Sequence, residues 1–257
     1  MRSKQYYWIK IFIFISICFS ACKLSEKEII PPNFIIIFAD DLGYGDLSSF
    51  GHPTIKTPNL DKMAHEGMKL TQFYVAASIC TPSRAGLLTG KLPAKIGMSG
   101  ARSVLFPDSY GGLPTTESTI SSMLSKVGYT TACIGKWHLG HKKEFLPTQH
   151  GFDYYFGIPY SNDMSPPNNN WDYAKAAFPP LPLMEGTEII ELEPDQSQLT
   201  RRYTDKAIEF INKNKNKPFF LYFAHAFPHV PLHVDSADAG KSKRGLYGDV
   251  VQVLDKS

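Results

Sequence analysis

Hydrophobic residues are gathered in short runs along this chain, and the runs are separated by stretches with a helical or an irregular pattern. Residues 34–39 and 218–224 form two almost continuously apolar runs, and residues 129–134 form a third, less continuous one. Runs of this length, rich in β-branched and aromatic side chains, are typical of strands buried on both faces of a parallel sheet. We expect a further strand over residues 70–75, leading into a helix that begins near residue 80.

Helical patterns lie between these runs. Residues 57–67 begin with Thr-Pro and end at a glycine, as a capped helix does. Residues 119–127 and 199–211 place their apolar side chains on one side of a helix. Residues 158–194 are rich in proline and asparagine and have little periodicity, so we expect a long ordered loop over one face of the domain. The alternation of strands and helices predicts a doubly wound α/β domain.

The length and the charge of the chain narrow the classes of protein to consider. With 257 residues it is long enough to bury one good core. The net charge is +3 and the basic residues are scattered, so the sequence predicts no nucleic-acid partner. The densest basic stretch, residues 213–217, is expected to be a solvated loop between a helix and a strand.

The first residues have the pattern of an export signal. Three basic residues within the first ten precede an apolar run that is too short to span a bilayer. Ser20-Ala21-Cys22 then resembles a bacterial lipobox, with Cys22 as the lipidated first residue of the mature chain, and ordinary cleavage nearby is the alternative. We expect a signal peptide over residues 1–21, a tether over residues 22–32, and an exported protein that is periplasmic or a cell-surface lipoprotein of a bacterium.

Residues 80–90 bring a thiol and a guanidinium together at a helix N-terminus. The spacing of Cys80 and Arg84 places both on one face of the predicted helix, while Pro82 suits its first turn and Gly90 its exit. Unpaired N–H groups and the macrodipole at a helix N-terminus attract anions. Together these features favour a site for a tetrahedral oxyanion. The alternative is a small buried cysteine beside a surface arginine.

The cysteine content argues against a disulfide scaffold. After processing, only Cys80 and Cys133 would remain, which is too few for a small fold held by disulfides. A bridge between these two is an alternative that would block chemistry at residue 80.

Two adjacent carboxylates follow the first predicted strand. Asp40 and Asp41 lie at its carboxyl end, where ligands bind in open α/β sheets. Adjacent carboxylates repel unless a cation or a proton lies between them, and oxygen-only ligands favour Ca²⁺ or Mg²⁺. The sequence therefore offers a metal site here, with an ordinary turn as the alternative.

Basic side chains follow the other two apolar runs. Lys136 and His138 come after the run over residues 129–134, where lysine supplies a point charge for an anion and histidine moves protons near neutral pH. A structural role is the alternative for both. Three histidines, His225, His229 and His233, follow the last apolar run, but their spacing in a proline-broken loop does not match a regular helical zinc pair.

Several of these stretches resemble the signatures of the type I sulfatases. Residues 80–90, with the sequence Cys-Thr-Pro-Ser-Arg-Ala-Gly-Leu-Leu-Thr-Gly, closely resemble the first signature, and residues 128–138 match the second. Residues 39–46 resemble the N-terminal metal motif of that family, and residues 157–163 resemble its arylsulfatase A branch. The resemblance covers nearly the whole chain from residue 33 and implies an alkaline-phosphatase-like fold, with a mostly parallel sheet flanked by helices.

The resemblance also implies a mechanism. In that family a sulfatase-maturating enzyme oxidises the cysteine that corresponds to Cys80 to formylglycine, whose hydrated aldehyde attacks the sulfur of an aryl or carbohydrate sulfate. Asp40, Asp41 and residue 80 would hold a divalent metal, Ca²⁺ or alternatively Mg²⁺. Arg84 and Lys136 would stabilise charge on the sulfate, and His138 would take a proton from the second hydroxyl of the hydrated aldehyde. His229 would lie near the leaving alcohol and, with Ser161 and Lys136, would contact the sulfate. His225 and His233 would be structural or peripheral.

The sequence departs from the family in one respect. Members are much longer and complete the metal site from an Asp-Asn pair after a later apolar strand, whereas this sequence has no apolar strand that ends in Asp-Asn-Gly and stops at residue 257, within a predicted helix. We therefore expect residues 33–257 to be the N-terminal portion of a sulfatase catalytic domain, with the C-terminal part missing. Asp40 and Asp41 alone give too few ligands for a tight Ca²⁺ site, so the chain alone is predicted to be poorly active, and an uncovered sheet edge would weaken it.

Two other functions stay open. A phosphomonoester or phosphonate ester hydrolase of the same superfamily would use a similar site, since tetrahedral anions share their shape and charge. A non-catalytic glycan-binding remnant is the other alternative, for which Trp171-Asp172-Tyr173 would offer aromatic surface.

Overall fold

The computed structural model describes residues 31–100, 103–166 and 178–257, and it divides the chain into two units, residues 1–31 and 32–257. The predicted signal peptide, Cys22 and the aromatic stretch 171–173 lie outside the described residues. None of the helices in the described ranges has both the length and the apolar character needed to cross a bilayer. All helices and strands of the described residues belong to the second unit.

Six strands and five α-helices, joined by loops and short 3₁₀ turns, are described in this unit. The strands are β1 (Phe34–Phe38), β2 (Thr130–Gly135), β3 (Tyr154–Gly157), β4 (Pro182–Glu185), β5 (Glu188–Leu192) and β6 (Phe219–Ala224). The helices are α2 (Pro58–Glu66), α3 (Cys80–Thr89), α4 (Ile120–Lys126), α5 (Leu199–Asn214) and α6 (Gly245–Lys256).

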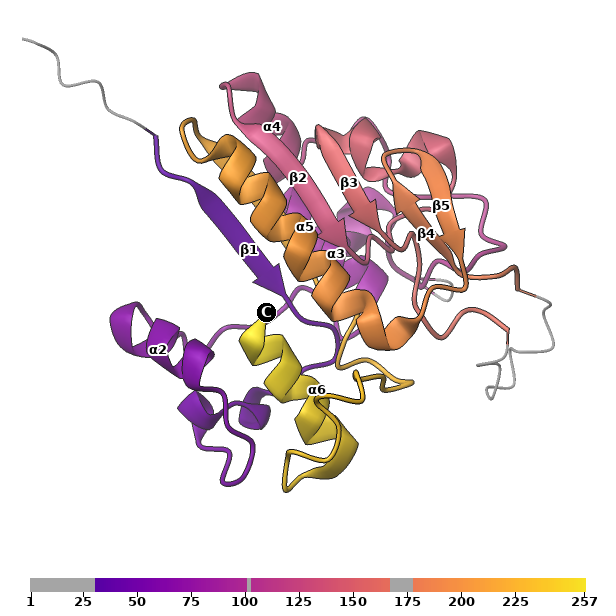
Figure 1. The fold of residues 1–257 in the computed structure, drawn as a ribbon. Helices are drawn as coiled ribbons and strands as arrows, with labels where there is room; N and C mark the ends of the chain where they lie inside the picture. Colours follow the sequence, from indigo (N-terminus) through magenta and orange to yellow (C-terminus); the bar gives the residue numbers. More distant parts are fainter. Residues whose placement is uncertain (1–30, 101–102, 167–177) are drawn as a thin grey trace, which may run out of the picture. The chain divides into compact units, whose positions relative to one another are not determined.

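The strands form one sheet in the order β1-β6-β2-β3-β4-β5 (Figure 1). The first four strands in this order are parallel; β4 runs antiparallel to β3, and β5 runs antiparallel to β4. The register places Phe38, Ala224 and Gly135 side by side at the carboxyl ends of β1, β6 and β2. The loops that follow these three strands therefore meet at one edge of the sheet, as the sequence predicted.

Helices cover both faces of the central strands, because β6 and β2 carry apolar side chains on either side. Long apolar residues of α5, among them Tyr203 and Phe210, pack on the face that carries Leu221 and Phe223. Residues of α3 and α4 pack with Cys133 and its neighbours on the opposite face. This two-sided packing confirms the predicted doubly wound arrangement.

Most helices begin and end where the sequence predicts. Helix α3 begins at Cys80 and ends at Gly90, whose positive φ of 66° suits a glycine. Helix α4 is capped by the Thr119 hydroxyl, which accepts a hydrogen bond from the Ser122 N–H at 3.1 Å. The strands predicted over residues 34–39, 129–134 and 218–224 are correct to within one residue at either end.

Helices α2 and α6 are tied together by a contact that no local pattern indicates. The Asp255 carboxylate of α6 accepts hydrogen bonds from the Leu60 N–H at 2.8 Å and the Asn59 N–H at 3.2 Å, in the first turn of α2. A carboxylate at a helix N-terminus satisfies unpaired N–H groups and complements the macrodipole. The C-terminal helix thus stabilises a helix almost 200 residues earlier.

Two predicted segments are wrong. Residues 70–75 form turns and exposed chain rather than a strand, and no strand of the described residues pairs with them. Residues 158–194 are not one long loop, since their described part includes the β4–β5 hairpin, with Gly186 in its turn. The hairpin forms because Leu181 and Leu183 are buried against the core, and this tertiary packing outweighs the weak local pattern. The four-residue strand β3 was also missed.

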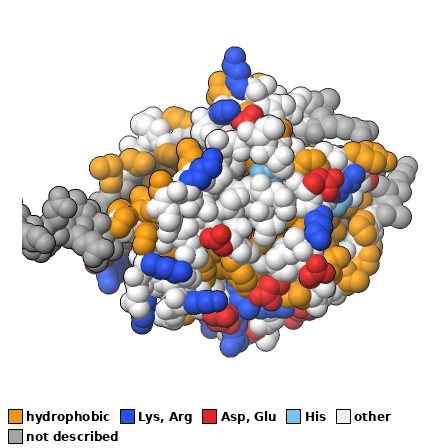
Figure 2. All heavy atoms as spheres, turned by 90° about the horizontal axis from the view of Figure 1, so that it is seen from above, with side chains coloured by type: hydrophobic (Ala, Val, Ile, Leu, Met, Phe, Trp, Pro, Cys, Tyr) orange, Lys and Arg blue, Asp and Glu red, His pale blue; other side chains and the backbone are white. Residues whose placement is uncertain are grey.

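Strand β1 is not buried on both faces as predicted. It is an edge strand that pairs only with β6 among the described strands, and Phe34, Ile35 and Ile37 are 43%, 46% and 48% exposed. An apolar run indicates that a strand can be buried on both faces, whereas its actual burial depends on which segments pack beside it. Elsewhere the surface is mixed, and on the face shown in Figure 2 basic and acidic side chains are interspersed.

Candidate functional site

The loops after β1, β6 and β2 converge on the N-terminal half of α3. Backbone hydrogen bonds lock them together: the His225 N–H donates to the Phe38 carbonyl at 2.8 Å, and the Lys136 N–H donates to the Ala224 carbonyl at 2.7 Å. The Asp40 N–H donates to the Phe227 carbonyl at 3.1 Å. Residues predicted separately from three strand ends are therefore brought to one place.

Four buried residues form a charged cluster here, which we define as Asp40, Arg84, Lys136 and Ser161. The Lys136 ammonium donates to Asp40 Oδ2 and, at 2.9 Å, to Ser161 Oγ. Arg84 Nη2 lies 3.4 Å from the same Asp40 oxygen. The side chains of Lys136 and Arg84 are fully buried, and that of Asp40 is 4% exposed. One carboxylate thus faces two cations in a region that water hardly reaches.

The electrostatics of the cluster favour a second anion. Burial raises the pKa of Asp40, but Lys136 and Arg84 outweigh it and hold that pKa well below its ordinary value. With Asp40 ionised, the two cations still exceed the anionic charge. Arg84 Nε is in addition a buried donor with no hydrogen-bond partner among the described residues. Buried charge that is incompletely paired is costly, so a bound anion would stabilise the cluster.

The Arg84 guanidinium is held from three sides. Arg84 Nη1 donates to the Lys136 carbonyl at 2.6 Å, and Nη2 donates to the His225 carbonyl at 3.4 Å. The guanidinium also lies over the Phe38 ring, 5.4 Å from its centroid, a favourable cation–π distance. Because these contacts come from the ends of β2, β6 and β1, the guanidinium cannot move without the sheet.

Cys80 is the first residue of α3 and is half-buried near the cluster. Burial raises the pKa of its thiol; Lys136 and Arg84 lower it, and Asp40 raises it further. The thiol is therefore not the activated thiolate of a cysteine nucleophile. Cys80 and Cys133 are both free, so the bridge between them that we considered is not formed.

His138 is neutral in a defined tautomer. Its Nε2 lies 2.8 Å from the Leu105 carbonyl oxygen, which only accepts, so Nε2 carries the proton. Burial, followed by Lys136 and Arg84, lowers the pKa of His138 well below its ordinary value. Nδ1 is then a buried lone pair with no partner among the described residues. This arrangement suits a base that accepts a proton at Nδ1.

Asp41 and His229 lie on the more open side of the cluster. The Asp41 side chain is 59% exposed, and its Oδ2 is 3.7 Å from His229 Nε2. Its φ of 61° turns the chain sharply, so adjacent carboxylates are presented to different surroundings. His229 also acts electrostatically on Asp40, which places it near the cluster.

Two other histidines of the same loop differ from His229. His225 is buried with its Nε2 3.3 Å from Ser257 Oγ, and burial with Arg84 lowers its pKa to about 3, so the ring is neutral. His233 lies beside the Phe227 ring, with 6.2 Å between centroids. Their surroundings are those of packed side chains, and the His225 carbonyl, rather than its ring, contacts Arg84.

The carboxylates fit a divalent cation only in part. Asp40 and Asp41 bring oxygens alone, as Ca²⁺ and Mg²⁺ prefer, but Lys136 already occupies one oxygen of Asp40. No group of three or more His, Cys, Asp or Glu side chains that could hold an ion occurs in the described part of the chain. Ca²⁺ takes six to eight oxygen ligands. Two adjacent carboxylates fall short of that number.

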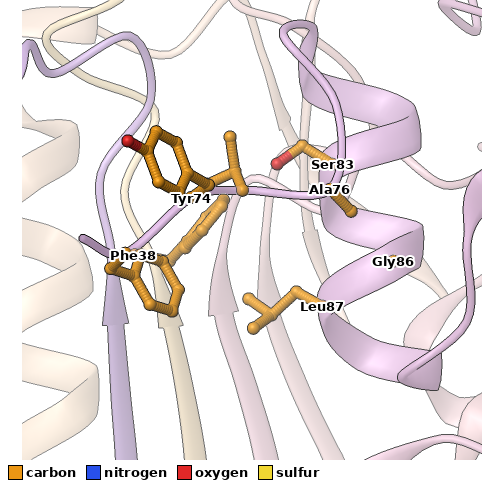
Figure 3. A pocket seen from close by; sticks show the side chains of 8 residues that line it. Phe38, Tyr74, Ala76, Ser83, Gly86 and Leu87 are labelled. Carbon is orange, nitrogen blue, oxygen red and sulfur yellow. The ribbon is translucent and has the colours of Figure 1, made fainter.

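A pocket of about 250 Å³ lies between α3 and the end of β1 (Figure 3). Phe38, Tyr74 and Leu87 surround it, and Ser83 lines it from the helix that carries Cys80. None of its lining residues belongs to the charged cluster. The pocket is mostly apolar and is therefore not the anion site.

Several contributors to the site were missed from the sequence. The Leu105 carbonyl fixes His138, Phe38 supports Arg84, and the Tyr222 hydroxyl lies 3.5 Å from Arg84 Nη1. Phe38 and Tyr222 carried one available signal, namely aromatic residues at or near the ends of strands that lead to polar loops. A backbone carbonyl carries no signal in the sequence.

Comparison with known proteins gives a consistent result. The family model described as Sulfatase matches residues 32–254. Arylsulfatase A of Homo sapiens is 43% identical over 238 residues, covering 88% of this chain and 46% of the relative. N-acetylgalactosamine-6-sulfatase of Homo sapiens is 38% identical over 242 residues, covering 88% of this chain and 45% of the relative. The chain therefore spans about half the length of the curated relatives it matches.

Solved structures agree with this. The PsFucS1 sulfatase from Pseudoalteromonas sp. matches with a TM-score of 0.74 at 31% identity, over 88% of this chain and 50% of that one. A structure titled Ps i-CgsB matches with a TM-score of 0.72 at 35% identity, over 88% and 52%; another of the same protein is described in complex with k-i-k-neocarrahexaose. These likenesses confirm the predicted alkaline-phosphatase-like fold.

Proposed function

This chain belongs to the sulfatase family, and from that premise we propose that its site hydrolyses sulfate esters of aryl or carbohydrate alcohols through a formylglycine made from Cys80. The observation that carries the proposal is the charged cluster, in which two fully buried cations face one carboxylate beside the N-terminus of α3. Preorganised positive charge in a dry site is what stabilises charge on the oxygens of a transferring group.

The state of Cys80 explains why a modification is needed. A thiol whose pKa is raised by burial is a poor nucleophile near neutral pH, and it offers no second hydroxyl with which to release sulfate. As a hydrated aldehyde, residue 80 would supply one hydroxyl to attack sulfur and a second whose loss of a proton expels sulfate and restores the carbonyl. A sulfatase-maturating enzyme is the partner that this step requires.

The surrounding residues would bind the sulfate oxygens and transfer the protons that the reaction requires. Arg84 and Lys136 bind the sulfate oxygens, and Ser161 holds the Lys136 ammonium in place. His138 accepts the proton of the second hydroxyl at Nδ1, since Nε2 is committed to the Leu105 carbonyl. His229, beside Asp41 on the open side, would protonate the leaving alcohol from Nε2 as an imidazolium, since its Nδ1 donates to the Val230 carbonyl.

A divalent cation is part of the proposal. Asp40, Asp41 and an oxygen of modified residue 80 would hold it, with Ca²⁺ favoured by the oxygen ligands and Mg²⁺ as the alternative. The cation would supply further positive charge at the sulfate oxygens. Because the described residues offer so few ligands, we expect these 257 residues alone to bind it weakly and to turn over slowly.

The deciding experiment is the mass of the peptide that contains residue 80, after production with a maturating enzyme. Formylglycine makes that peptide about 18 Da lighter than the cysteine form, through loss of H₂S and gain of oxygen. Hydrolysis of p-nitrophenyl sulfate should then exceed that of p-nitrophenyl phosphate, and Cys80→Ala should abolish it. An unmodified thiol in the matured protein would contradict the proposal, and a preference for the phosphate would favour the phosphomonoesterase alternative.

We also propose that the protein is exported and anchored through a lipid on Cys22, on the evidence of its N-terminal sequence. Metabolic labelling with a palmitate analogue should mark the wild-type chain and not Cys22→Ala. Equal labelling of the two would contradict the anchor.

A further inference from the structure

Two loops are pinned together beside the charged cluster, residues 103–113 and residues 136–145. The Leu113 N–H donates to the Leu139 carbonyl at 2.8 Å, and the Leu105 carbonyl binds His138. Gly112 and Gly140 both press against Phe145, and a Cβ on either would overlap with that side chain. Close packing of this kind gives the loops fixed positions relative to each other.

Each of these loops contributes one residue to a pair formed by the exposed Tyr110 and the half-buried Lys142, which we call the rim pair. The Tyr110 side chain is 86% exposed. The Lys142 ammonium lies 4.5 Å from the centroid of the Tyr110 ring, within the range of a cation–π contact. This pair gives an aromatic surface with a positive charge at one side, held on a rigid support.

The rim pair is linked to the charged cluster by a short series of contacts. His141, the neighbour of Lys142, lies edge-on to the Tyr160 ring with 6.0 Å between centroids. The residue after Tyr160 is Ser161, which binds Lys136. Lys142 is also four residues after His138. The rim pair therefore lies on the loops that build the sulfate-binding centre, and not on a remote surface.

The chemistry of the pair fits one kind of ligand. An aromatic face provides a large apolar contact at little cost in conformational entropy, which suits the C–H face of a sugar ring. A lysine beside it supplies a mobile point charge for an acidic group. Neither residue is needed to fill the core.

We propose that the rim pair binds a second sugar ring, one that carries an acidic substituent, next to the ring whose sulfate enters the charged cluster. The proposal rests on the proposed function and makes it more specific, since it names acidic oligosaccharides rather than isolated aryl sulfates as the preferred substrates. The acidic group is a second sulfate ester or a carboxylate, and both would pair with Lys142.

The test measures the Kd of the 257-residue chain, in the presence of Ca²⁺, for probes of increasing size. Galactose 6-sulfate has a single ring and reaches only the charged cluster. Oligosaccharides of ι-carrageenan carry further sulfates, and those of chondroitin 6-sulfate also carry carboxylates. We expect at least one oligosaccharide to bind more tightly than galactose 6-sulfate, and the type that gains identifies the acidic group.

Substitutions then test whether the rim pair causes the tighter binding of oligosaccharides. Tyr110→Ala and Lys142→Met should each weaken oligosaccharide binding about five- to tenfold and leave galactose 6-sulfate unchanged. Tyr110→Phe keeps the ring and should bind like the wild type. Lys143→Met is the matched control, because Lys143 is an exposed neighbour outside the rim pair, and it should have no effect. Thermal unfolding checks that the variants are folded.

The outcomes separate the two proposals. If galactose 6-sulfate binds and no oligosaccharide gains affinity, or if Tyr110→Ala leaves the gain intact, the rim pair is not a sugar site and the proposed function stands. If Tyr110→Ala weakens galactose 6-sulfate equally, its role is general and the inference is overturned. If neither probe class binds, both proposals fall.

Discussion

Asp40 is the one anion of the charged cluster and faces two cations that water does not reach. Replacing it by Asn would leave Lys136 and Arg84 buried without a counter-charge. Removing one partner of a buried ionic group typically costs about 3–5 kcal/mol of stability. We therefore predict that Asp40→Asn lowers the free energy of unfolding by that amount, as measured by urea denaturation.

The neighbouring carboxylate provides the control for this prediction. Asp41 is 59% exposed and lies 3.7 Å from His229, so Asp41→Asn should change the free energy of unfolding by no more than about 0.5 kcal/mol. Equal effects of the two substitutions would mean that the cluster is solvated and its charges are screened.

The buried histidines predict how stability depends on pH. Burial lowers the pKa of His150 to about 4 and that of His225 to about 3, and it lowers that of His138 as well. The unfolded chain binds these protons below about pH 6.5 and the folded chain does not. Stability should therefore fall as the pH drops from 6.5 toward 4, by up to about 1.4 kcal/mol per pH unit for each histidine.

His150→Phe tests this dependence, because the new ring keeps a partner for Trp137, 5.4 Å from His150, and does not titrate. Urea denaturation between pH 7.5 and 4.5 should give a shallower slope for the variant. Parallel slopes would show that His150 takes up its proton in the folded state. The Asp40 carboxylate adds its own loss of stability only below about pH 4, as its depressed pKa is approached.

Among the elements, the junction of β2 with Lys136 is the most sensitive. Gly135 has a φ of 114°, and a Cβ on it would overlap with the Ala224 carbonyl of β6. Gly135→Ala should therefore separate β2 from β6 and move Lys136. We predict a loss of stability of more than about 3 kcal/mol or a failure to accumulate as folded protein.

Gly128→Ala isolates the steric part of that effect. Gly128 also has a positive φ, 91°, but a Cβ there would meet nothing within 4 Å. Only backbone strain should then count, about 1–2 kcal/mol. If the two variants unfold at the same urea concentration, the contact with Ala224 is not a constraint.

The elements also show how far a sequence determines this fold. The local sequence alone predicts five of the elements, because their apolar patterns match central, packed positions in the fold: β2, β6, α3, α4 and α5. The local sequence does not predict the β4–β5 hairpin or the exposed chain at residues 70–75, since the structure of both depends on tertiary contacts with other segments. In the site, Lys136 and His138 could be predicted from their motif and from their place after a strand. The Leu105 carbonyl that orients His138 comes from a distant loop and leaves no trace in the sequence.

For the molecule as a whole, the edge strand β1, which pairs only with β6 among the described strands, is a site at which another chain could pair. Ile35 and Ile37 are about half exposed on one face of this edge strand, and such edges pair with other chains. We predict that the 257-residue chain self-associates as its concentration rises. Light scattering should show that Ile35→Lys combined with Ile37→Lys keeps it monomeric.

The control for this prediction is Val127→Lys, at an exposed position after α4. It adds charge outside strand β1, so it should leave the association unchanged. If Val127→Lys has the same effect as the double variant, net charge and not the strand edge governs association.

Strand β1 ends two residues before the Asp40-Asp41 pair. Local opening of this strand would therefore move residues of the site. Fraying of β1 would displace Phe38 and Asp40, both of which contact the Arg84 guanidinium, and would therefore disturb the charged cluster. Amide hydrogen exchange along residues 34–38 should consequently slow when sulfate is added. The exchange rate of this edge strand would then report whether sulfate is bound at the charged cluster.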